Sequence, residues 1–166
     1  MSSVGAYGAL FYNGELYDNV HFSIHGQSSS GFPTQKKSMN LDFPRDHRFQ
    51  IAEGMKRVDD INLLTNFADK SKLRNTLAYE QRAFAGAGYH LAYPVRVHHN
   101  GDFFAVYDFV EDGDDRWLER LGLDPEGALY KMYNSMEPAS GEKKTRRDEG
   151  NADLQALVNG VRLSGQ

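Results

Sequence analysis

A lysine doublet opens residues 36–43, a stretch with the alternating pattern of a β-strand. On a period of two residues, Lys37 shares one side of that strand with apolar residues. These are Met39, Leu41 and Phe43. A lysine on the core side of a strand must either reach solvent at the strand end or meet an anion. The pattern therefore indicates a place where an anion could bind.

A glutamate stands in an equally unusual place in the helix predicted over residues 71–85. The apolar stripe of this helix consists of Leu73, Leu77 and Phe84. Glu80 falls inside that stripe at helical spacing. Each isolated charge would cost several kcal/mol to bury, and pairing Lys37 with Glu80 would offset part of that cost. Protein kinases use such a pair to hold the α- and β-phosphates of ATP. A structural salt bridge, or a lysine that reaches solvent, is the alternative, and the pattern alone favours it.

Short-range signals predict the elements that must position these two residues. Asn13-Gly14 joins two apolar segments, 6–12 and 16–24, into a hairpin, and the lysine strand completes an early antiparallel sheet of three strands. Asp69 is the expected N-cap of the helix. A second hairpin turns at Asn100-Gly101, between strands at 93–99 and 103–110. The remaining short elements are a strand at 61–64, a helix at 114–121, a strand at 128–132 and an amphipathic helix at 152–163. The fold class expected is α+β, an antiparallel sheet with one long packed helix.

Composition limits the classes of function. The chain of 166 residues has a formal charge of −4 and a pI near 5.8, which argues against a nucleic-acid partner. It contains no cysteine, so thiolate chemistry and disulfides are excluded. No run of about 18 apolar residues is present, so no membrane span is expected. His98 and His99 are adjacent on a strand and point to opposite faces, and no histidine belongs to a zinc motif, so no metal site is predicted.

A loop of small and polar residues from Gly26 to Gly31 precedes the lysine strand. Its backbone N–H groups could cradle phosphates. It matches neither the glycine-rich loop of kinases nor the Walker A pattern, and a simple turn is the favoured interpretation. The segment from 134 to 150 is polar and charged and is predicted to be a loop.

Several motifs, taken in order, resemble the CotH kinase family, which is named for the bacterial spore coat protein H. The pieces are His25-Gly26-Gln27-Ser28-Ser29, Lys36-Lys37-Ser38, Asp69 to Asn75, Asn100-Gly101 with Val106-Tyr107, Val110-Glu111, and Gly127 to Lys131. Together they extend over most of residues 6–132. The family usually has arginine where His25 stands.

The resemblance implies the N-terminal lobe of an atypical protein kinase fold, with ATP and Mg²⁺ as cofactors and a coat or surface protein as the substrate. Lys37 would then be the nucleotide-phosphate lysine and Glu80 its partner. Gly26, Ser28 and Ser29 would lie over the phosphates. The segment from Asp108 to Glu111 would be the hinge that offers backbone groups to adenine. A secreted, cell-surface or spore-coat location is implied as well.

On this resemblance, residues 1–133 are expected to form the kinase-like lobe and hinge, 134–150 a charged loop, and 151–166 the start of the next lobe. The family keeps its catalytic and metal-binding aspartates beyond the position of Gln166. We therefore predict no catalytic residue within these residues, and a fragment that is inactive alone. The alternative is a non-catalytic coat or surface module of the same fold that works by protein contact.

Overall fold

The computed structural model describes residues 5–26, 29–31, 33 and 36–164. The chain divides into two compact units, residues 1–112 and 113–166. This division follows Asp112, whereas the lobe expected from the sequence extends to residue 133.

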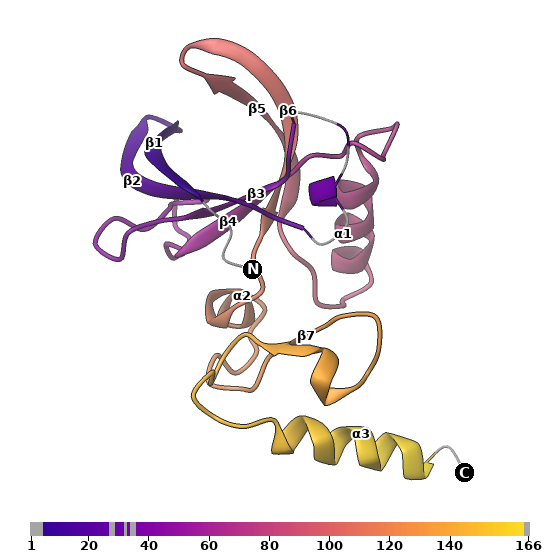
Figure 1. The fold of residues 1–166 in the computed structure, drawn as a ribbon. Coiled ribbons are helices and arrows are strands. Elements are labelled where there is room, and N and C mark those ends of the chain that lie inside the picture. The colour runs from indigo at the N-terminus through magenta and orange to yellow at the C-terminus, as the bar shows by residue number, and fades with distance from the viewer. Residues whose placement is uncertain (1–4, 27–28, 32, 34–35, 165–166) are drawn as a thin grey trace. The chain divides into compact units, whose positions relative to one another are not determined.

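The first unit is built on a six-stranded antiparallel sheet (Figure 1). Its spatial order is β1 (Ala6–Tyr12), β2 (Glu15–Ile24), β3 (Met39–Asp42), β4 (Asp60–Leu64), β6 (Asp102–Glu111) and β5 (Ala92–His99). The two predicted hairpins are present. Asn13 and Gly14 have φ of 48° and 86°, and Asn100 and Gly101 have φ of 52° and 92°. Both turns therefore use positive φ at their two central residues, as Asn-Gly hairpin turns do.

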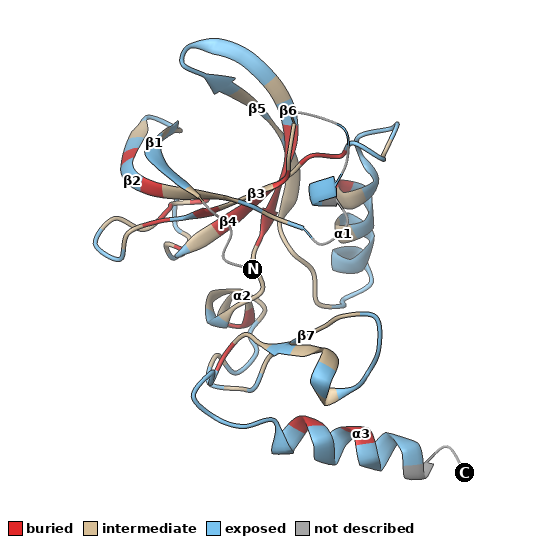
Figure 2. Ribbon diagram, in the orientation of Figure 1, coloured by how far each residue is buried: buried red, intermediate tan, exposed pale blue. Residues whose placement is uncertain are grey.

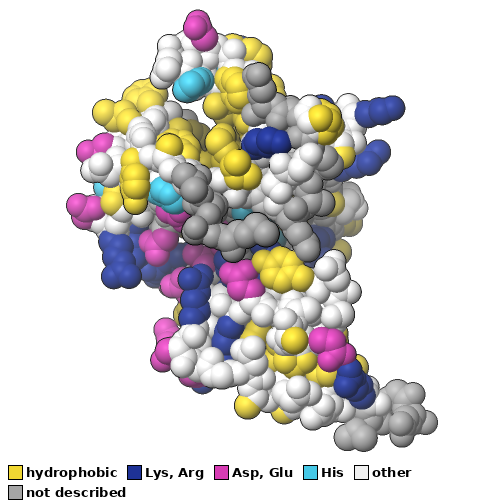
Figure 3. Space-filling view, viewed as in Figure 1, with side chains coloured by type: hydrophobic (Ala, Val, Ile, Leu, Met, Phe, Trp, Pro, Cys, Tyr) yellow, Lys and Arg dark blue, Asp and Glu magenta, His cyan; other side chains and the backbone are white. Residues whose placement is uncertain are grey.

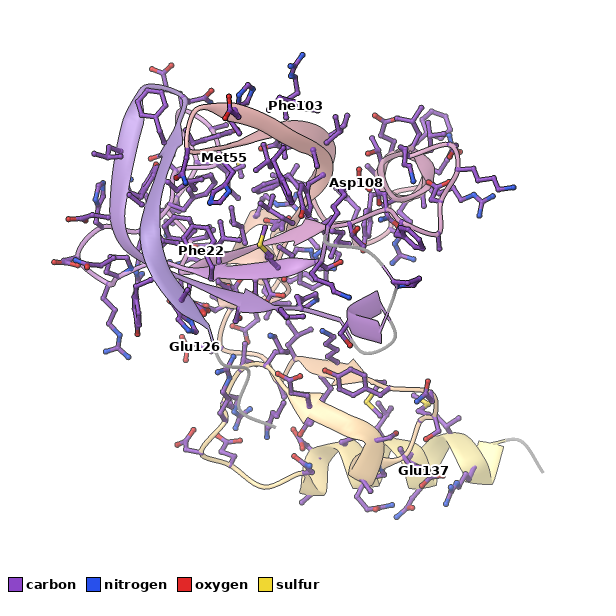
Figure 4. The ribbon with its side chains drawn as sticks, turned by 45° about the horizontal axis from the view of Figure 1, so that its top comes forward. Phe22, Met55, Phe103, Asp108, Glu126 and Glu137 are labelled. Atoms are coloured by element: carbon purple, nitrogen blue, oxygen red, sulfur yellow. The ribbon has the colours of Figure 1, made fainter. Side chains whose placement is uncertain are left out.

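The sheet is curled, and its buried residues line the inside of the curve. Figure 1 shows the β1–β2 and β5–β6 hairpins as two arcs on either side of β3 and β4. At one end, side chains of the two outer strands reach each other, since the hydroxyls of Tyr12 and Tyr93 lie 3.1 Å apart. Met55, from the loop between β3 and β4, packs against this core (Figure 4). The fully or almost fully buried side chains include Tyr17, Val20, Leu41, Phe49, Tyr107 and Phe109.

Strand β3 begins at Met39 rather than at Lys36. The predicted alternation of side chains holds within the strand, since Leu41 and Phe43 are both buried. It does not extend to Lys36 and Lys37, because these residues precede the strand. Local contacts, and not strand geometry, set the directions of their side chains.

Helix α1 extends over Arg74–Phe84, within the predicted range, but it does not bury the predicted stripe. Leu73, Leu77 and Phe84 are 45%, 53% and 90% exposed. The one buried residue of the helix is Thr76. In Figure 2 the helix is accordingly mostly pale blue, while red concentrates on the strands of the sheet. The expectation of a helix packed through its apolar stripe is therefore corrected.

The second unit contains α2 (Asp115–Arg120), the two-stranded sheet of β7 (Tyr130–Met132) and β8 (Gly141–Lys143), the short 3₁₀ turn η2 (Pro138–Ser140) and α3 (Ala152–Ser164). Because η2 and β8 fall in the segment predicted as a charged loop, that expectation is also corrected. The contacts of Lys143 help to hold this segment in regular structure. Its side chain is only 6% exposed, with Nζ 3.6 Å from both Glu149 and Asp153 and 5.3 Å from the centroid of the Tyr130 ring. In the described part of the chain, no helix has the length and apolar character needed to cross a membrane.

Candidate functional site

Lys37 lies against the small-residue loop that precedes it. Its Nζ donates a hydrogen bond to the carbonyl oxygen of Ser30, at 3.0 Å. Ser30 belongs to the 3₁₀ turn η1 (Ser29–Gly31), and Gly26 enters the loop with φ of 96°. Ser28, the third loop residue predicted to contact phosphate, lies outside the described residues. The structure thus brings Lys37 and the loop together through a backbone carbonyl.

Glu80 lies on the exposed side of α1. Among the residues that the structure describes, it takes part in no ion pair, so the expected pair with Lys37 is not formed. The physical reason is the rotation of the helix. The buried or half-buried residues of α1 are Asn75, Thr76 and Tyr79, whereas Leu77, Glu80 and Phe84 are exposed.

The predicted hinge, Asp108 to Glu111, is the end of β6. These residues pair with β4 on one side and most of them with β5 on the other, so their backbone groups are largely engaged in the sheet. Glu111 is 4% exposed, and its Oε2 accepts a hydrogen bond from the backbone N–H of Leu91 at 3.0 Å. The expectation that this segment offers free backbone groups to adenine is corrected, because a central strand has few to offer.

A different cluster of polar residues forms where β4 ends. We call it the Lys36 cluster; it consists of Lys36, Asn66, Lys72, Asn75 and Asp108. Lys36 is anchored by its own backbone, since the Oγ1 of Thr65 donates to the Lys36 carbonyl at 2.5 Å. Thr65 is held in turn, because its N–H donates to the Oγ of Ser38 at 3.0 Å. These two contacts tie the segment before β3 to the end of β4.

Asp108 forms the floor of the Lys36 cluster. It comes from the centre of β6, is 0% exposed, and lies on the side of the sheet toward α1 (Figure 4). Its Oδ2 accepts a hydrogen bond from the Nδ2 of Asn75, in the first turn of α1, at 3.1 Å. The same Nδ2 lies 3.4 Å from the Oδ1 of Asn66. Within the described residues, the other carboxylate oxygen, Oδ1, is buried without a hydrogen-bond partner.

Two lysines complete the cluster. Lys36 is half-buried, with Nζ 4.8 Å from the centroid of the Tyr107 ring. Burial lowers the pKa of Lys36 and the positive charge of Lys72 lowers it further, whereas the Asp108 carboxylate raises it. Lys72 has φ of 61°, unusual for a residue with a side chain, and its Nζ donates to the carbonyl of Asn66 at 2.5 Å. The backbone therefore holds Lys72 turned back toward the cluster.

Asp69 fixes the approach to α1, but the prediction that it is the N-cap is corrected, because α1 starts at Arg74 and Leu73 is the N-cap residue. Its Oδ1 accepts from the N–H of Ser71 and its Oδ2 from the N–H of Arg74, both at 2.9 Å. These bonds, led by the one from Arg74, lower the pKa of Asp69 to about 2. Asp69 thereby fixes the short turn that carries Lys72 and precedes Asn75.

The chemistry available in the Lys36 cluster is anion binding. Two ammonium groups and one carboxylate leave a net positive charge, with Lys36 half-buried and Lys72 exposed. Such a set suits phosphate oxygens, which prefer charge-assisted hydrogen bonds. The described residues contain no group of three or more His, Cys, Asp or Glu side chains that could hold a metal ion, and we assign no metal ligand.

A second polar cluster, the Glu15 cluster, consists of Glu15, Tyr17, His47 and Arg57. Oε1 of Glu15 lies 2.8 Å from both the Nε2 of His47 and the Nη1 of Arg57. Oε2 accepts from the hydroxyl of Tyr17 at 2.7 Å. Hydrogen bonds from these groups, with Arg57 first, lower the pKa of Glu15 to about 2. This cluster fastens the start of β2 to the loop between β3 and β4.

Sequence reasoning does not find the Lys36 cluster, because it selects Lys37 from the doublet and Glu80 as the acid, and both lie outside the cluster. One signal could have found Asp108: it is the single charge within Phe103 to Val110, a run that is otherwise apolar. A charge in the middle of such a strand is buried unless the strand is at an edge, and a buried charge needs a partner.

Comparison with known proteins gives one match. The model of the family described as CotH kinase protein matches residues 22–163, which is most of the chain. A search of curated proteins found no match.

Proposed function

Since the chain belongs to the CotH kinase protein family, we propose that its first unit binds the phosphates of a nucleotide through the Lys36 cluster. Family membership suggests a spore-coat, kinase-like function. The observation that supports phosphate binding is the half-buried ammonium group of Lys36, on which the positive charge of Lys72 also acts. A half-buried ammonium group that feels a second positive charge is stabilised by an anion.

In this proposal the whole protein is an ATP-dependent serine kinase that acts on coat or surface proteins. The curled sheet with α1 beside it would serve as the nucleotide-binding lobe of an atypical kinase fold. ATP, bound with Mg²⁺, would supply the phosphoryl group. The residues of this unit would hold and orient the phosphates, with the loop from Gly26 to Ser30 covering them.

Lys37 is the competing choice for the phosphate lysine. The contact between Lys37 and the Ser30 carbonyl supports a role in fixing the loop. Lys36 has the better surroundings for a phosphate, because a second lysine and a buried acid act on its ammonium group. The two lysines are adjacent, so they form a matched pair of sites for substitution.

Calorimetric titration of the 166-residue chain with a non-hydrolysable ATP analogue tests the proposal. We expect Lys36→Ala to weaken binding at least about tenfold, which is the free energy of one charge-assisted hydrogen bond, and Lys37→Ala to change it little. Circular dichroism would establish that each variant is folded. The reverse order of effects would transfer the role to Lys37. Absence of measurable binding by the wild-type chain would reject nucleotide binding by this unit.

A second candidate function is contact with coat or surface proteins without catalysis. Large hydrophobic side chains are exposed on the first unit, among them Tyr7 (76%), Phe11 (69%), Leu16 (60%) and Phe103 (53%). Figure 3 shows hydrophobic side chains gathered on the part of the molecule that carries the two hairpins. Exposed apolar groups of this kind are typical of protein interfaces. This function predicts that Phe11→Ser and Phe103→Ser abolish association with coat proteins, while Lys36→Ala has no effect on it.

A further inference from the structure

The two edges of the six-stranded sheet differ in how well they are protected. Strand β5 forms one edge and carries Pro94, Arg96 and a register irregularity between Val97 and His98. A proline, a charge or a bulge on an edge strand discourages the pairing of a further strand. Strand β1 forms the other edge and contains neither a charged residue nor a proline. The edge at β1 is therefore the one suited to strand pairing.

The side of β1 that faces away from the core is apolar. Tyr7 and Phe11 are largely exposed, and Ala9, which lies between them, is exposed as well. These three residues alternate with residues such as Leu10, which packs against the core. Leu16 of β2 is in register with Phe11 and is also exposed. The edge of the sheet thus carries a strip of exposed apolar side chains.

The backbone groups on the open edge belong to the same residues. In an antiparallel ladder, alternate residues turn their N–H and C=O groups toward the neighbouring strand. Tyr12 closes the two-residue turn with Glu15, so every second residue, counted back from Tyr12, bonds toward β2. The one irregular step of this ladder places its extra residue in β2, so the count along β1 holds. Tyr7, Ala9 and Phe11 consequently turn their backbone groups outward, where no other described strand pairs with β1.

Strand β1 is complementary to a second copy of itself. When two β1 strands pair antiparallel about Ala9, each Tyr7 faces Phe11 of the other copy, which makes two aromatic cross-strand pairs. On the core side of the strand, Leu10 faces Gly8, so a large residue meets a small one. The register joins the residues whose backbone groups point outward, so its hydrogen bonds need no change in β1. It brings no like charges together, because β1 is uncharged.

We propose that β1 is a dimerisation edge, at which two copies of this chain pair antiparallel about Ala9 and join their sheets into one. The interface is isologous and uses both β1 edges, so only the protected β5 edges remain and assembly stops at the dimer. One strand pair makes a small interface, and we expect a dissociation constant of about 10–100 μM. This inference goes beyond the proposed function and does not depend on nucleotide binding.

Sedimentation equilibrium of the 166-residue chain, at concentrations up to about 1 mM, tests the proposal. The wild-type chain should reach twice the mass of one chain and no more. Ala9→Lys and Ala9→Glu should each raise the dissociation constant at least about fivefold, because like charges then face each other at the two-fold axis. His99→Lys adds a charge at an exposed position of the β5 edge and should change it little.

A mixture of the two Ala9 variants identifies the occupant of the edge. At the two-fold axis, the lysine of one chain faces the glutamate of the other, so an equimolar mixture should associate at least as tightly as the wild type. Association that neither variant weakens, or that the mixture does not restore, would overturn the proposal, because position 9 would not meet itself. A wild-type chain that stays monomeric at about 1 mM would also overturn it, and would leave an extended peptide of another protein as the occupant.

The backbone contribution is tested by Ala9→Pro. This substitution removes the outward N–H group and leaves the bonds to β2 in place, so the melting temperature should be largely kept. The dissociation constant should rise at least about tenfold, because each copy loses one hydrogen bond at the axis. In the wild type, amide exchange of Tyr7, Ala9 and Phe11 should slow as the chain concentration rises. Exchange at these three amides that does not change with concentration would overturn the pairing of β1.

Discussion

The two polar clusters of the first unit differ in how completely their hydrogen-bonding groups are matched. In the Glu15 cluster both carboxylate oxygens have donors, from His47, Arg57 and Tyr17. In the Lys36 cluster, the described residues supply a donor to one oxygen of the buried Asp108 carboxylate, through Asn75, and none to the other. A network whose donors and acceptors are all paired holds chain segments together. A network with an unpaired polar group is less stable but can still bond to a ligand.

The largest stability effect that distinguishes the clusters is expected for Tyr17→Phe. The Tyr17 side chain is 0% exposed, and its hydroxyl donates to Glu15 and accepts from the N–H of Gln50 at 3.1 Å. Removing it leaves buried groups unpaired and should lower the free energy of unfolding by about 1–3 kcal/mol, measured in urea. Tyr7→Phe, at a position that is 76% exposed, is the control. Weaker nucleotide binding by Tyr17→Phe in its folded state would contradict the separation of the two clusters.

Substitution of Lys72 should weaken ligand binding and leave stability almost unchanged, the opposite of the result expected for Tyr17→Phe. Lys72→Gln keeps a donor for the Asn66 carbonyl but removes one of the two positive charges, so affinity for the ATP analogue should fall about tenfold with little loss of stability. The NMR titration midpoint of Lys36 should rise, because the like charge that lowers its pKa is gone. Lys70→Gln, an exposed lysine of the same loop, is the control. A fall in the Lys36 midpoint would show that the two ammonium groups do not interact.

Acid should weaken the Glu15 cluster. The pKa of Glu15 is lowered in the folded protein from 4.5 to about 2, so the unfolded state binds protons more readily. Its contribution to stability is therefore complete above about pH 4.5 and is lost as the pH falls toward 2. Asp69, whose pKa is also lowered to about 2, adds to the same trend. Unfolding by urea at several pH values should show a shallower decline in Glu15→Gln, while Asp18→Asn, at an exposed position, retains the wild-type slope.

Most of the fold could be predicted from local patterns. Asn13-Gly14 and Asn100-Gly101 allow the positive φ that two-residue hairpin turns require, so both hairpins follow from four residues. The pairing of β4 with β6 could not be predicted in this way. Its residues are far apart in the chain, as the register of Leu63 with Phe109 shows, and no local signal encodes that contact. Once β4 lies beside β6, the predicted hinge becomes a central strand.

The candidate site was harder to predict because its geometry depends on where regular structure stops. The strand period was applied to Lys37, but β3 begins at Met39, and the lysines obey the contacts of Thr65 and Ser30 instead. The helical period was applied to Glu80, but rotation of α1 depends on long-range contacts such as that of Asn75 with Asp108. Both errors share a cause: a periodic pattern fixes which residues share a face, and tertiary contacts decide where that face points.

The smallest effect is expected for Leu77→Ala, which tests how α1 is attached. In a helix packed through its apolar stripe, loss of this leucine would cost about 2–5 kcal/mol. Leu77 is 53% exposed, and alanine favours helix at least as well, so we expect a change below about 0.5 kcal/mol in the free energy of unfolding. A loss of several kcal/mol would mean that the stripe is buried in solution. Glu80 would then regain its place beside Lys37, and the contrast between a filled structural cluster and an open Lys36 cluster would no longer hold.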